Sequence, residues 1–452
     1  MKKLVNVFYT FGIFLLFIAI WLGFLFGKVS FGAVVFHLSL DSADKIDYYS
    51  LTTFILLVLL LPALISYFTS RMSTWLKVIA TVGCFYYFLW HVGLVPFVQM
   101  FYRPDRMANY YQSVQLNQIK EKKNLVVIYV ESLEKNFADK SLVKEDLIKE
   151  LTALEESHVK FSDYQEGYGN DWTIASIVGS QCGIPLQLPF EKYLRINRCE
   201  DDKSFLGNAL CLGDVLQKEN YHQVFINGVD LKFAFVGDFF KTHKYDEVYG
   251  PNEIKKVFNR NFDEHFWGLS DASLMKVAKE KFSDLYKGNK PFNLTLLTVD
   301  THAPHGMTSK ECRDRFGNEP TYAEIIQCTS DAVSDFVKYV KENDTKNNTI
   351  ILVMGDHLAK KNSLSNEINQ KPRKIFASFM SNNQNAINVK DTVYAIDFYP
   401  MILNQIVDDK ICKAGIGHVP GIFGCGKREM SEKKFKNIYE SYSHLLKEFW
   451  CK

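Results

Sequence analysis

The sequence of 452 residues has no long basic run, and its formal net charge is only +2. Nucleic-acid binding needs clustered lysine and arginine, so no nucleic-acid partner is expected. The chain also has no C-x-x-C pair among its nine cysteines. This spacing argues against a zinc cluster and favours disulfides. Internal repeats and low-complexity tracts are missing too, so the length predicts two or three ordinary packed units.

Long apolar runs are confined to the first hundred residues. The first run covers residues 4–26 behind Lys2 and Lys3, and it is long enough to cross a bilayer as a helix. A cleaved signal peptide would have a shorter apolar core and a small-residue cleavage site, so we interpret the run as an uncleaved anchor. Two more runs, near 51–68 and 76–98, predict a transmembrane anchor of three helices within residues 1–99. Three such runs argue against buried core helices of a soluble protein.

Basic residues orient the three expected spans. Lys2, Lys3, Arg71 and Lys77 place the N-terminus and the 69–75 loop in the cytoplasm, because cytoplasmic loops carry an excess of lysine and arginine. Everything after the third span then lies outside. All the cysteines except Cys84 fall in that outer part, and an even number of cysteines in an oxidising compartment suggests disulfides.

The pairs Cys312–Cys328 and Cys412–Cys425 each enclose a short, loop-like stretch and are expected to form disulfides. Cys182 is expected to pair with Cys211, while the partners of Cys199 and Cys451 stay open.

At residue 124 the composition changes from a polar and aromatic segment to apolar runs, which marks the start of a globular domain. Residues 100–123 are expected to be a connector. Apolar, β-branched runs at 125–130, 224–226, 292–299 and 349–354 are typical of strands buried on both faces. Helical patterns such as 141–154 and 323–340 lie between them. The alternation predicts an α/β domain over 124–428 with a doubly wound, mainly parallel sheet. The charged amphipathic tail, 429–452, is expected to form a helix packed on this domain.

Polar residues follow three of the predicted strands. Glu131 comes after the first, His302 follows closely after 292–299, and Asp356 and His357 follow 349–354. In open α/β sheets ligands bind at the carboxyl ends of the strands, so these side chains should meet at one edge. Carboxylate and imidazole ligands suit zinc, manganese or magnesium. A lone Glu at such a place is more often a helix cap or a solvated residue, and a lone His is usually structural. Their shared position therefore carries the prediction of a divalent metal site.

Thr173 is the candidate nucleophile. It follows a glycine-bearing loop, 167–172, and stands at the expected start of a helix over 173–181. A helix N-terminus favours anions, and a nearby metal would ease formation of the alkoxide. A plain N-cap is the competing interpretation, because Thr, Asp and Asn are favoured there for structural reasons.

Several segments together resemble a known family. They are NLVVIYVESLE at 124–134, DWTIA at 171–175, SQCGIP at 180–185, CLGD at 211–214, TVDTHAP at 298–304 and GDHLA at 355–359. In this order they are similar to the phosphoglycerol transferase I family of Gram-negative bacteria. That family is related to lipoteichoic acid synthase and the phosphoethanolamine transferases, in the alkaline phosphatase/sulfatase superfamily. The resemblance covers about residues 124–360, and the membrane part is similar in layout only.

The resemblance implies a role for each matching position. Lys232 falls where relatives often have an Arg that grips the headgroup, but Lys lacks the bidentate fork of Arg. The implied set is Glu131, Asp356 and His357 as metal ligands, Thr173 as a nucleophile that also touches the metal, and His302, Lys232 and Asp171 as substrate-binding residues, His302 also acting in catalysis.

The implied reaction transfers phosphoglycerol from phosphatidylglycerol to a periplasmic or surface glycan through a phospho-Thr173 intermediate. The enzyme would sit in a bacterial inner membrane with its catalytic domain in the periplasm. A phosphoethanolamine transferase acting on lipopolysaccharide or glycan would share every metal-site residue. A non-catalytic protein that binds or senses envelope glycans should have lost some of them. A true sulfatase needs a C/S-x-P-x-R motif, and Cys182-Gly-Ile-Pro-Leu has neither the spacing nor the Arg.

Overall fold

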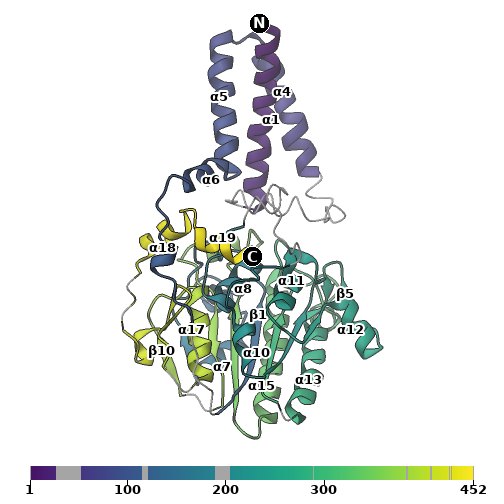
Figure 1. The fold of residues 1–452 in the computed structure, drawn as a ribbon. Coiled ribbons are helices and arrows are strands. Elements are labelled where there is room, and N and C mark those ends of the chain that lie inside the picture. The colour runs from purple at the N-terminus through teal and green to yellow at the C-terminus, as the bar shows by residue number, and fades with distance from the viewer. Residues whose placement is uncertain are drawn as a thin grey trace. The chain divides into compact units, whose positions relative to one another are not determined.

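The computed structural model describes residues 2–26, 52–114, 121–188, 204–288, 290–382, 385–407, 410–426, 428 and 430–450. These residues form two compact units, shown in Figure 1. The first contains the described residues up to Asp105, with short later segments, and the second contains most of the chain from Arg106 onward. Cys199 and Cys451, whose pairing was left open, lie outside the described residues.

The N-terminal unit consists of apolar helices. Residues 2–23 and 52–71 are each long and apolar enough to cross a membrane. The third run is divided, because the chain bends by 65° at Gly93, which has a positive φ of 75°. An unbroken span over 76–98 is therefore not observed, and a third span exists only if the two halves are counted together. The helices are α1 (Lys2–Phe26), a π-helical turn (Ile55–Leu60) continuing into α4 (Leu61–Phe68), α5 (Thr74–His91) and α6 (Leu94–Met100).

Several polar groups within these helices are paired with one another. The hydroxyls of Thr10 and Ser66 lie 2.6 Å apart, and the Lys77 ammonium donates to the Asn6 side chain at 2.8 Å and to the Ser70 carbonyl at 2.7 Å. Helices α1 and α5 are packed against each other at Gly12, where an added Cβ would lie 3.5 Å from Cα of Thr81, an ordinary contact distance. Such pairing and close packing are what helices in a bilayer require.

The second unit is built on one eight-stranded sheet with the order β10-β2-β9-β8-β1-β7-β3-β4. The central strands β8, β1, β7, β3 and β4 are parallel to one another, and only β9 runs antiparallel to its neighbours. The expected mainly parallel α/β sheet is thus present. The strands are β1 (Asn124–Val130), β2 (Val159–Phe161), β3 (His222–Asn227), β4 (Glu247–Tyr249), β7 (Phe292–Leu297), β8 (Thr349–Gly355), β9 (Ala377–Phe379) and β10 (Ile387–Val389). Two separate hairpins pair β5 (Glu264–His265) with β6 (Gly268–Leu269) and β11 (Lys413–Ala414) with β12 (Gly417–His418).

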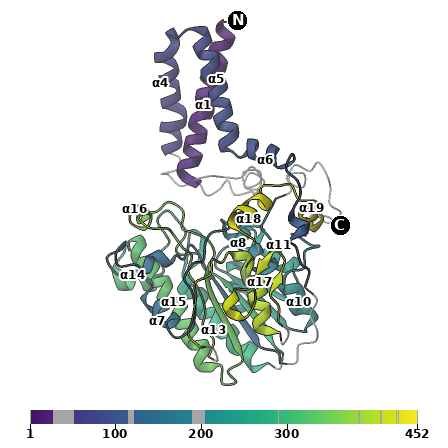
Figure 2. The same ribbon diagram turned by 90° about the vertical axis from the view of Figure 1, so that its left-hand side faces the viewer.

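Helices cover both faces of the sheet, so the central strands β1, β7 and β8 are buried along their whole length. Figure 2 shows α7, α13 and α15 on one side of the domain and α8, α10 and α17 on the other. The helices of this unit are α7 (Lys149–Glu155), α8 (Thr173–Cys182), α10 (Leu212–Lys218), α11 (Val236–Thr242), α12 (Pro251–Phe258), α13 (Asp271–Lys287), α14 (Lys310–Phe316), α15 (Tyr322–Asn343), α16 (Ser365–Ile368), α17 (Ala395–Ile406), α18 (Glu432–Tyr439) and α19 (His444–Trp450).

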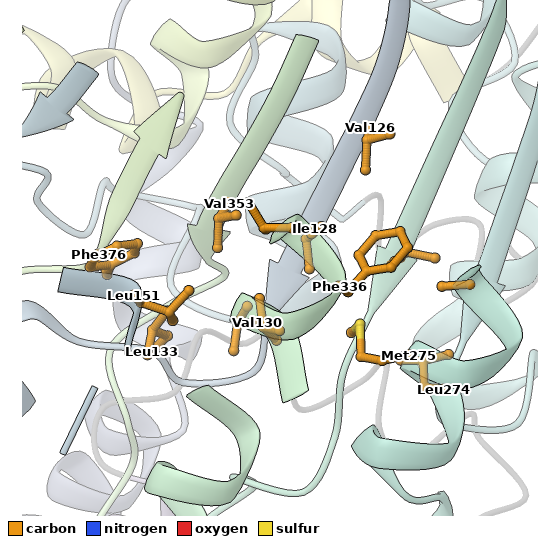
Figure 3. Close-up of a cluster of buried hydrophobic side chains, with 14 of the residues drawn as sticks. Val126, Ile128, Val130, Leu133, Leu151, Leu274, Met275, Phe336, Val353 and Phe376 are labelled. Carbon is orange, nitrogen blue, oxygen red and sulfur yellow. The ribbon is translucent and has the colours of Figure 1, made fainter. Parts of the chain in front are cut away.

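Strand β1 divides its side chains between the two faces with a period of two. Val126, Ile128 and Val130 belong to the buried cluster that includes Leu151 of α7 and Phe336 of α15 (Figure 3). Tyr129 points the other way, and its hydroxyl lies 2.7 Å from the Ser180 hydroxyl of α8. Helices on both faces of the sheet therefore contact β1, the strand that ends just before Glu131.

Three local expectations differ from the structure. Residues 141–148 are turns rather than helix, because Asp139 and Asp146 accept backbone hydrogen bonds two residues on and compete with the helix. The tail forms two helices, α18 and α19, instead of one; Ser443 accepts from the Leu446 amide at the start of the second. Part of the expected connector belongs to the domain, where Gln112 pairs with Gly415.

The three expected disulfides are present. They join Cys182 to Cys211, Cys312 to Cys328, and Cys412 to Cys425.

Candidate active site

The ends of strands β1 and β8 bring together the three expected metal ligands. Val130 and Gly355 are register partners, so Glu131 and Asp356 leave the sheet side by side. Nε2 of His357 lies 3.6 Å from Oε1 of Glu131 and 3.4 Å from Oδ2 of Asp356. Ligand atoms of the three side chains all lie within 4.8 Å of one another, and all three residues are buried.

Local hydrogen bonds fix these side chains and decide which atoms remain available. Oδ1 of Asp356 accepts the backbone amides of Ser132 and His357, both at 2.8 Å, and the Ser132 hydroxyl donates to Oε1 of Glu131 at 2.6 Å. Nδ1 of His357 lies 2.9 Å from the Leu358 carbonyl. A carbonyl only accepts, so Nδ1 carries the proton and Nε2 keeps its lone pair.

The arrangement fits a divalent cation. Oδ2 of Asp356 is buried and has no hydrogen-bond partner among the described residues. Burial, together with the charge of Asp356, raises the pKa of Glu131 to about 7, so two carboxylates here lack a counter-charge. Two carboxylates and an imidazole with a free Nε2 form a donor set typical of zinc or manganese.

The cysteines and His243 form a second cluster of possible ligands, but its chemistry is already accounted for. Cys182 and Cys211 are bonded to each other, and Nδ1 of His243 lies 2.7 Å from the Asp214 carboxylate. The cluster is a disulfide beside a hydrogen-bonded histidine and aspartate.

Thr173 lies beside the candidate metal ligands. It is the first residue of α8, it is 9% exposed, and its hydroxyl oxygen lies 3.4 Å from Nε2 of His357. The N-cap of α8 is Trp172, which makes no side-chain capping bond. The Thr173 hydroxyl is therefore not the cap of this helix, so the competing interpretation of Thr173 as a plain N-cap does not hold.

His302 follows the third strand end. Strand β7 is tied to β1 beyond the sheet, since Thr298 accepts the Glu131 amide at 2.9 Å and Thr301 donates to the Glu131 carbonyl. Nδ1 of His302 donates to the Ala303 carbonyl at 2.8 Å, which leaves Nε2 without a proton in the neutral ring. Burial lowers the pKa of His302, partly opposed by that hydrogen bond and by the charge of Asp356.

The two expected headgroup residues lie in different surroundings. Lys232 is exposed in the turn after β3, where its backbone amide donates to the Asp230 carboxylate at 2.9 Å. Asp171 is half-buried two residues before Thr173, and its carbonyl accepts from the Lys360 ammonium at 2.8 Å. Their substrate-binding roles stay predictions.

Two residues that sequence reasoning missed support the loop after His357. Glu134 accepts the Ala359 amide at 2.9 Å, and Arg373 donates to the Ala359 carbonyl at 2.6 Å and to Glu134 at 2.8 Å. Glu134 stands three residues after a predicted ligand, so its proximity in sequence was a usable signal. Arg373 carried none, because only the fold brings it here.

Glu166 and Trp267 were missed as well. Glu166 accepts the Leu358 amide at 3.0 Å, and burial raises the pKa of its carboxyl group. The ring of Trp267 lies 4.6 Å from that of His302, centroid to centroid. Both come from segments outside the predicted strand ends.

Comparison with known proteins identifies similar sequences and folds. A family model described as Sulfatase matches residues 123–375. Phosphoglycerol transferase I of Escherichia coli strain K12 is 36% identical over 274 residues, and the protein of the same name from strain O157:H7 matches equally. The match covers 60% of this chain but only 35% of the relative, so it spans about a third of the relative's length.

Two solved structures share the fold. A protein of the alkaline phosphatase superfamily from Vibrio parahaemolyticus gives a TM-score of 0.53 at 22% identity, covering 70% of this chain and 74% of that one. The lipoteichoic acid synthase LtaP from Listeria monocytogenes gives a TM-score of 0.50 at 17% identity, covering 65% and 74%.

Proposed function

Because the chain belongs to the sulfatase family of the alkaline phosphatase superfamily, we propose that it is a metal-dependent phosphotransferase anchored in a membrane. Its reaction is the transfer of phosphoglycerol from phosphatidylglycerol to a glycan of the cell envelope, through a phospho-Thr173 intermediate. One observation carries this: the Thr173 hydroxyl lies 3.4 Å from Nε2 of His357, inside the buried group that Glu131 and Asp356 complete. The similarity to phosphoglycerol transferase I supports the choice of transferred group.

The residues present would hold a divalent cation through Glu131, Asp356 and His357, with Thr173 beside it. Such a cation would lower the pKa of the Thr173 hydroxyl and polarise a phosphoryl oxygen. The start of α8 adds a favourable field for the negative phosphate, because its first amide groups point outward.

Two displacements complete the reaction. In the first, Oγ1 of Thr173 bonds to phosphorus, the bond to the diacylglycerol oxygen breaks, and diacylglycerol leaves with a proton. In the second, an acceptor hydroxyl bonds to phosphorus, the bond to Thr173 breaks, and the threonine regains a proton. His302 passes these protons through Nε2, because its Nδ1 is held by the Ala303 carbonyl.

The proposal includes a compartment. The three disulfides of the α/β domain suit an oxidising space, and Lys2, Lys3 and Arg71 suit a cytoplasmic N-terminus. The anchor would thus sit in a bacterial inner membrane with the domain in the periplasm. A reporter fused after Lys452 should be active outside the cytoplasm, and activity only in the cytoplasm would overturn the orientation.

The function is tested by supplying the purified full chain and Mn²⁺ with one lipid at a time. Diacylglycerol should be released from phosphatidylglycerol, and mass spectrometry should find the added group on Thr173. Release from phosphatidylethanolamine alone would make the protein a phosphoethanolamine transferase instead. Release from neither lipid, with metal bound, would favour a non-catalytic role. Comparing envelope glycans with and without the gene would identify the acceptor.

A further inference from the structure

A short hairpin places an aromatic ring against His302. Strands β5 and β6 pair as His265 with Gly268, so Phe266 and Trp267 form the turn between them. The rings of Trp267 and His302 lie 4.6 Å apart with an interplanar angle of 36°. Phe233 lies on Trp267 in turn, at 5.4 Å and nearly perpendicular. Trp267 is thus packed between His302 and a second aromatic ring.

The same hairpin is bonded to the chain segment that carries His302. The Trp267 amide donates to Nδ1 of His265 at 3.2 Å, so Nδ1 is unprotonated and Nε2 carries the proton. That nitrogen donates to Oδ1 of Asp300 at 2.8 Å; Asp300 is buried, and only 9% of the His265 side chain is exposed. Asp300 stands two residues before His302. A chain of hydrogen bonds therefore connects the amide of Trp267 to the loop that bears His302.

The hairpin is itself held rigidly. The Leu269 amide donates to the Gly228 carbonyl at 2.8 Å, just beyond the end of β3. Gly268 has a φ of 152°, and a Cβ there would lie 2.1 Å from the Gly228 carbonyl oxygen, so only glycine fits this contact. Asp300 is fixed too, since its amide donates to the buried Asp271 carboxylate at 3.2 Å.

His302 needs such support for its ring. The hydrogen bond of Nδ1 reaches only the carbonyl of the next residue, so it restrains the ring less than a bond to another element would. We propose that the hairpin of residues 264–269 sets the orientation of the His302 imidazole, with Trp267 as the positioning residue and His265 as its anchor on Asp300. The inference rests on the proposed function, in which His302 transfers protons.

The proposal is tested in the full chain by measuring diacylglycerol release from phosphatidylglycerol. Trp267→Ala should lower kcat by about tenfold to a hundredfold, the cost of a misplaced catalytic group, and leave KM nearly unchanged. Trp267→Phe keeps a ring and should restore most of the rate. His265→Phe should behave like Trp267→Ala, while His265→Gln, whose amide can donate to Asp300, should recover part of the loss. Phe258→Ala is the matched control, because that ring packs on Phe262 and Arg260.

A double-mutant cycle separates positioning from general structure. If Trp267 acts through His302, Trp267→Ala should cost no further rate in a His302→Ala background. Additive losses, or a rise in KM with kcat unchanged, would overturn the proposal, since Trp267 would then act on the fold or on the substrate.

A second readout needs no turnover and so separates this inference from the proposed function. Diethyl pyrocarbonate modifies accessible imidazoles, and peptide mass spectrometry gives the rate at each histidine. Trp267→Ala should raise the rate at His302 severalfold while the exposed His305 serves as an internal reference. An unchanged rate at His302 would refute the contact even in an active protein. A raised rate in a protein that releases no diacylglycerol would leave the contact standing while the function fails.

Discussion

Oγ1 of Thr173 lies 3.4 Å from Nε2 of His357, although 184 residues separate them in the chain. The contact joins the start of α8 to the end of β8. It places a hydroxyl among the atoms best suited to bind a cation.

Replacing Thr173 should stop the reaction without disturbing the fold. Thr173→Ala should reduce diacylglycerol release by about 10⁴-fold or more, as loss of a nucleophile does in other enzymes. Thr173→Ser keeps the hydroxyl and should retain measurable activity. The thermal midpoint of Thr173→Ala should stay near that of the wild type, because the hydroxyl does not cap α8, the helix that Thr173 begins. Ordinary turnover by Thr173→Ala would disprove its role as nucleophile.

Metal removal should destabilise the domain. After dialysis against EDTA, adding Mn²⁺ to the metal-free protein should raise its thermal midpoint. A ligand at a hundred times its Kd stabilises the folded state by about 2.7 kcal/mol. Asp356→Asn should lose this response, since Oδ2 is buried and has no hydrogen-bond partner in the part of the chain that the structure describes. The exposed His305→Ala variant should respond like the wild type. An Asp356→Asn protein that responds fully would place the metal elsewhere.

The Glu134–Arg373 pair should be needed for stability. Arg373→Ala leaves the Glu134 carboxylate buried without its cation, which typically costs about 3–5 kcal/mol. Denaturant unfolding of the α/β domain, followed by tryptophan fluorescence, would measure the loss. The double variant Glu134→Gln, Arg373→Met should recover much of it, because no charge is then left unpaired. If Arg373→Ala and the double variant lost the same free energy of unfolding, the two side chains would stabilise the domain by packing and not by charge.

The Cys182–Cys211 disulfide should stabilise the end of the helix that carries Thr173. It closes a loop with a sequence separation of 29 residues, for which chain entropy predicts about 3–4 kcal/mol. The double variant with serine at both positions should therefore lower the thermal midpoint under non-reducing conditions. Peptide mapping without reduction checks the bond directly, and free thiols at both positions in the mature protein would contradict it.

Glu247 should make stability depend on pH in the acid range. Burial alone would raise its pKa, but hydrogen bonds from Lys281, Tyr249 and His222 and the charge of Lys281 hold it at about 2, below the ordinary 4.5. A depressed pKa contributes stability above about 4.5, and this is lost as the pH falls toward 2. The thermal midpoint of Glu247→Gln should lie below that of the wild type at neutral pH.

The difference in thermal midpoint between the wild type and Glu247→Gln should become smaller as the pH falls from about 4.5 toward 2. Glu280→Gln, which removes an exposed partner of Arg260, is the control and should shift the midpoint little at any pH. If the thermal midpoint of Glu247→Gln stayed the same distance below that of the wild type down to pH 3, the lowered pKa of Glu247 would be contradicted.

Much of the fold could be predicted because the central strands are buried on both faces. The runs at 125–130 and 349–354 became β1 and β8 with ends shifted by one residue at most. Short strands such as β9 and β10 have only three residues each and carried no comparable pattern. The helix expected at 141–154 failed in its first half, where Asp139 and Asp146 bind nearby backbone instead.

The sequence by itself determined which residues stand at the strand ends, because a strand's last apolar residue and the next polar one are neighbours in the chain. It therefore identified Glu131, Asp356 and His357 as a group. Only the tertiary structure decided that Thr173 comes within 3.4 Å of His357 and that Trp267 lies on His302. Those contacts depend on how α8 and the β5–β6 hairpin pack against the finished sheet, and no local pattern records the packing of segments so far apart.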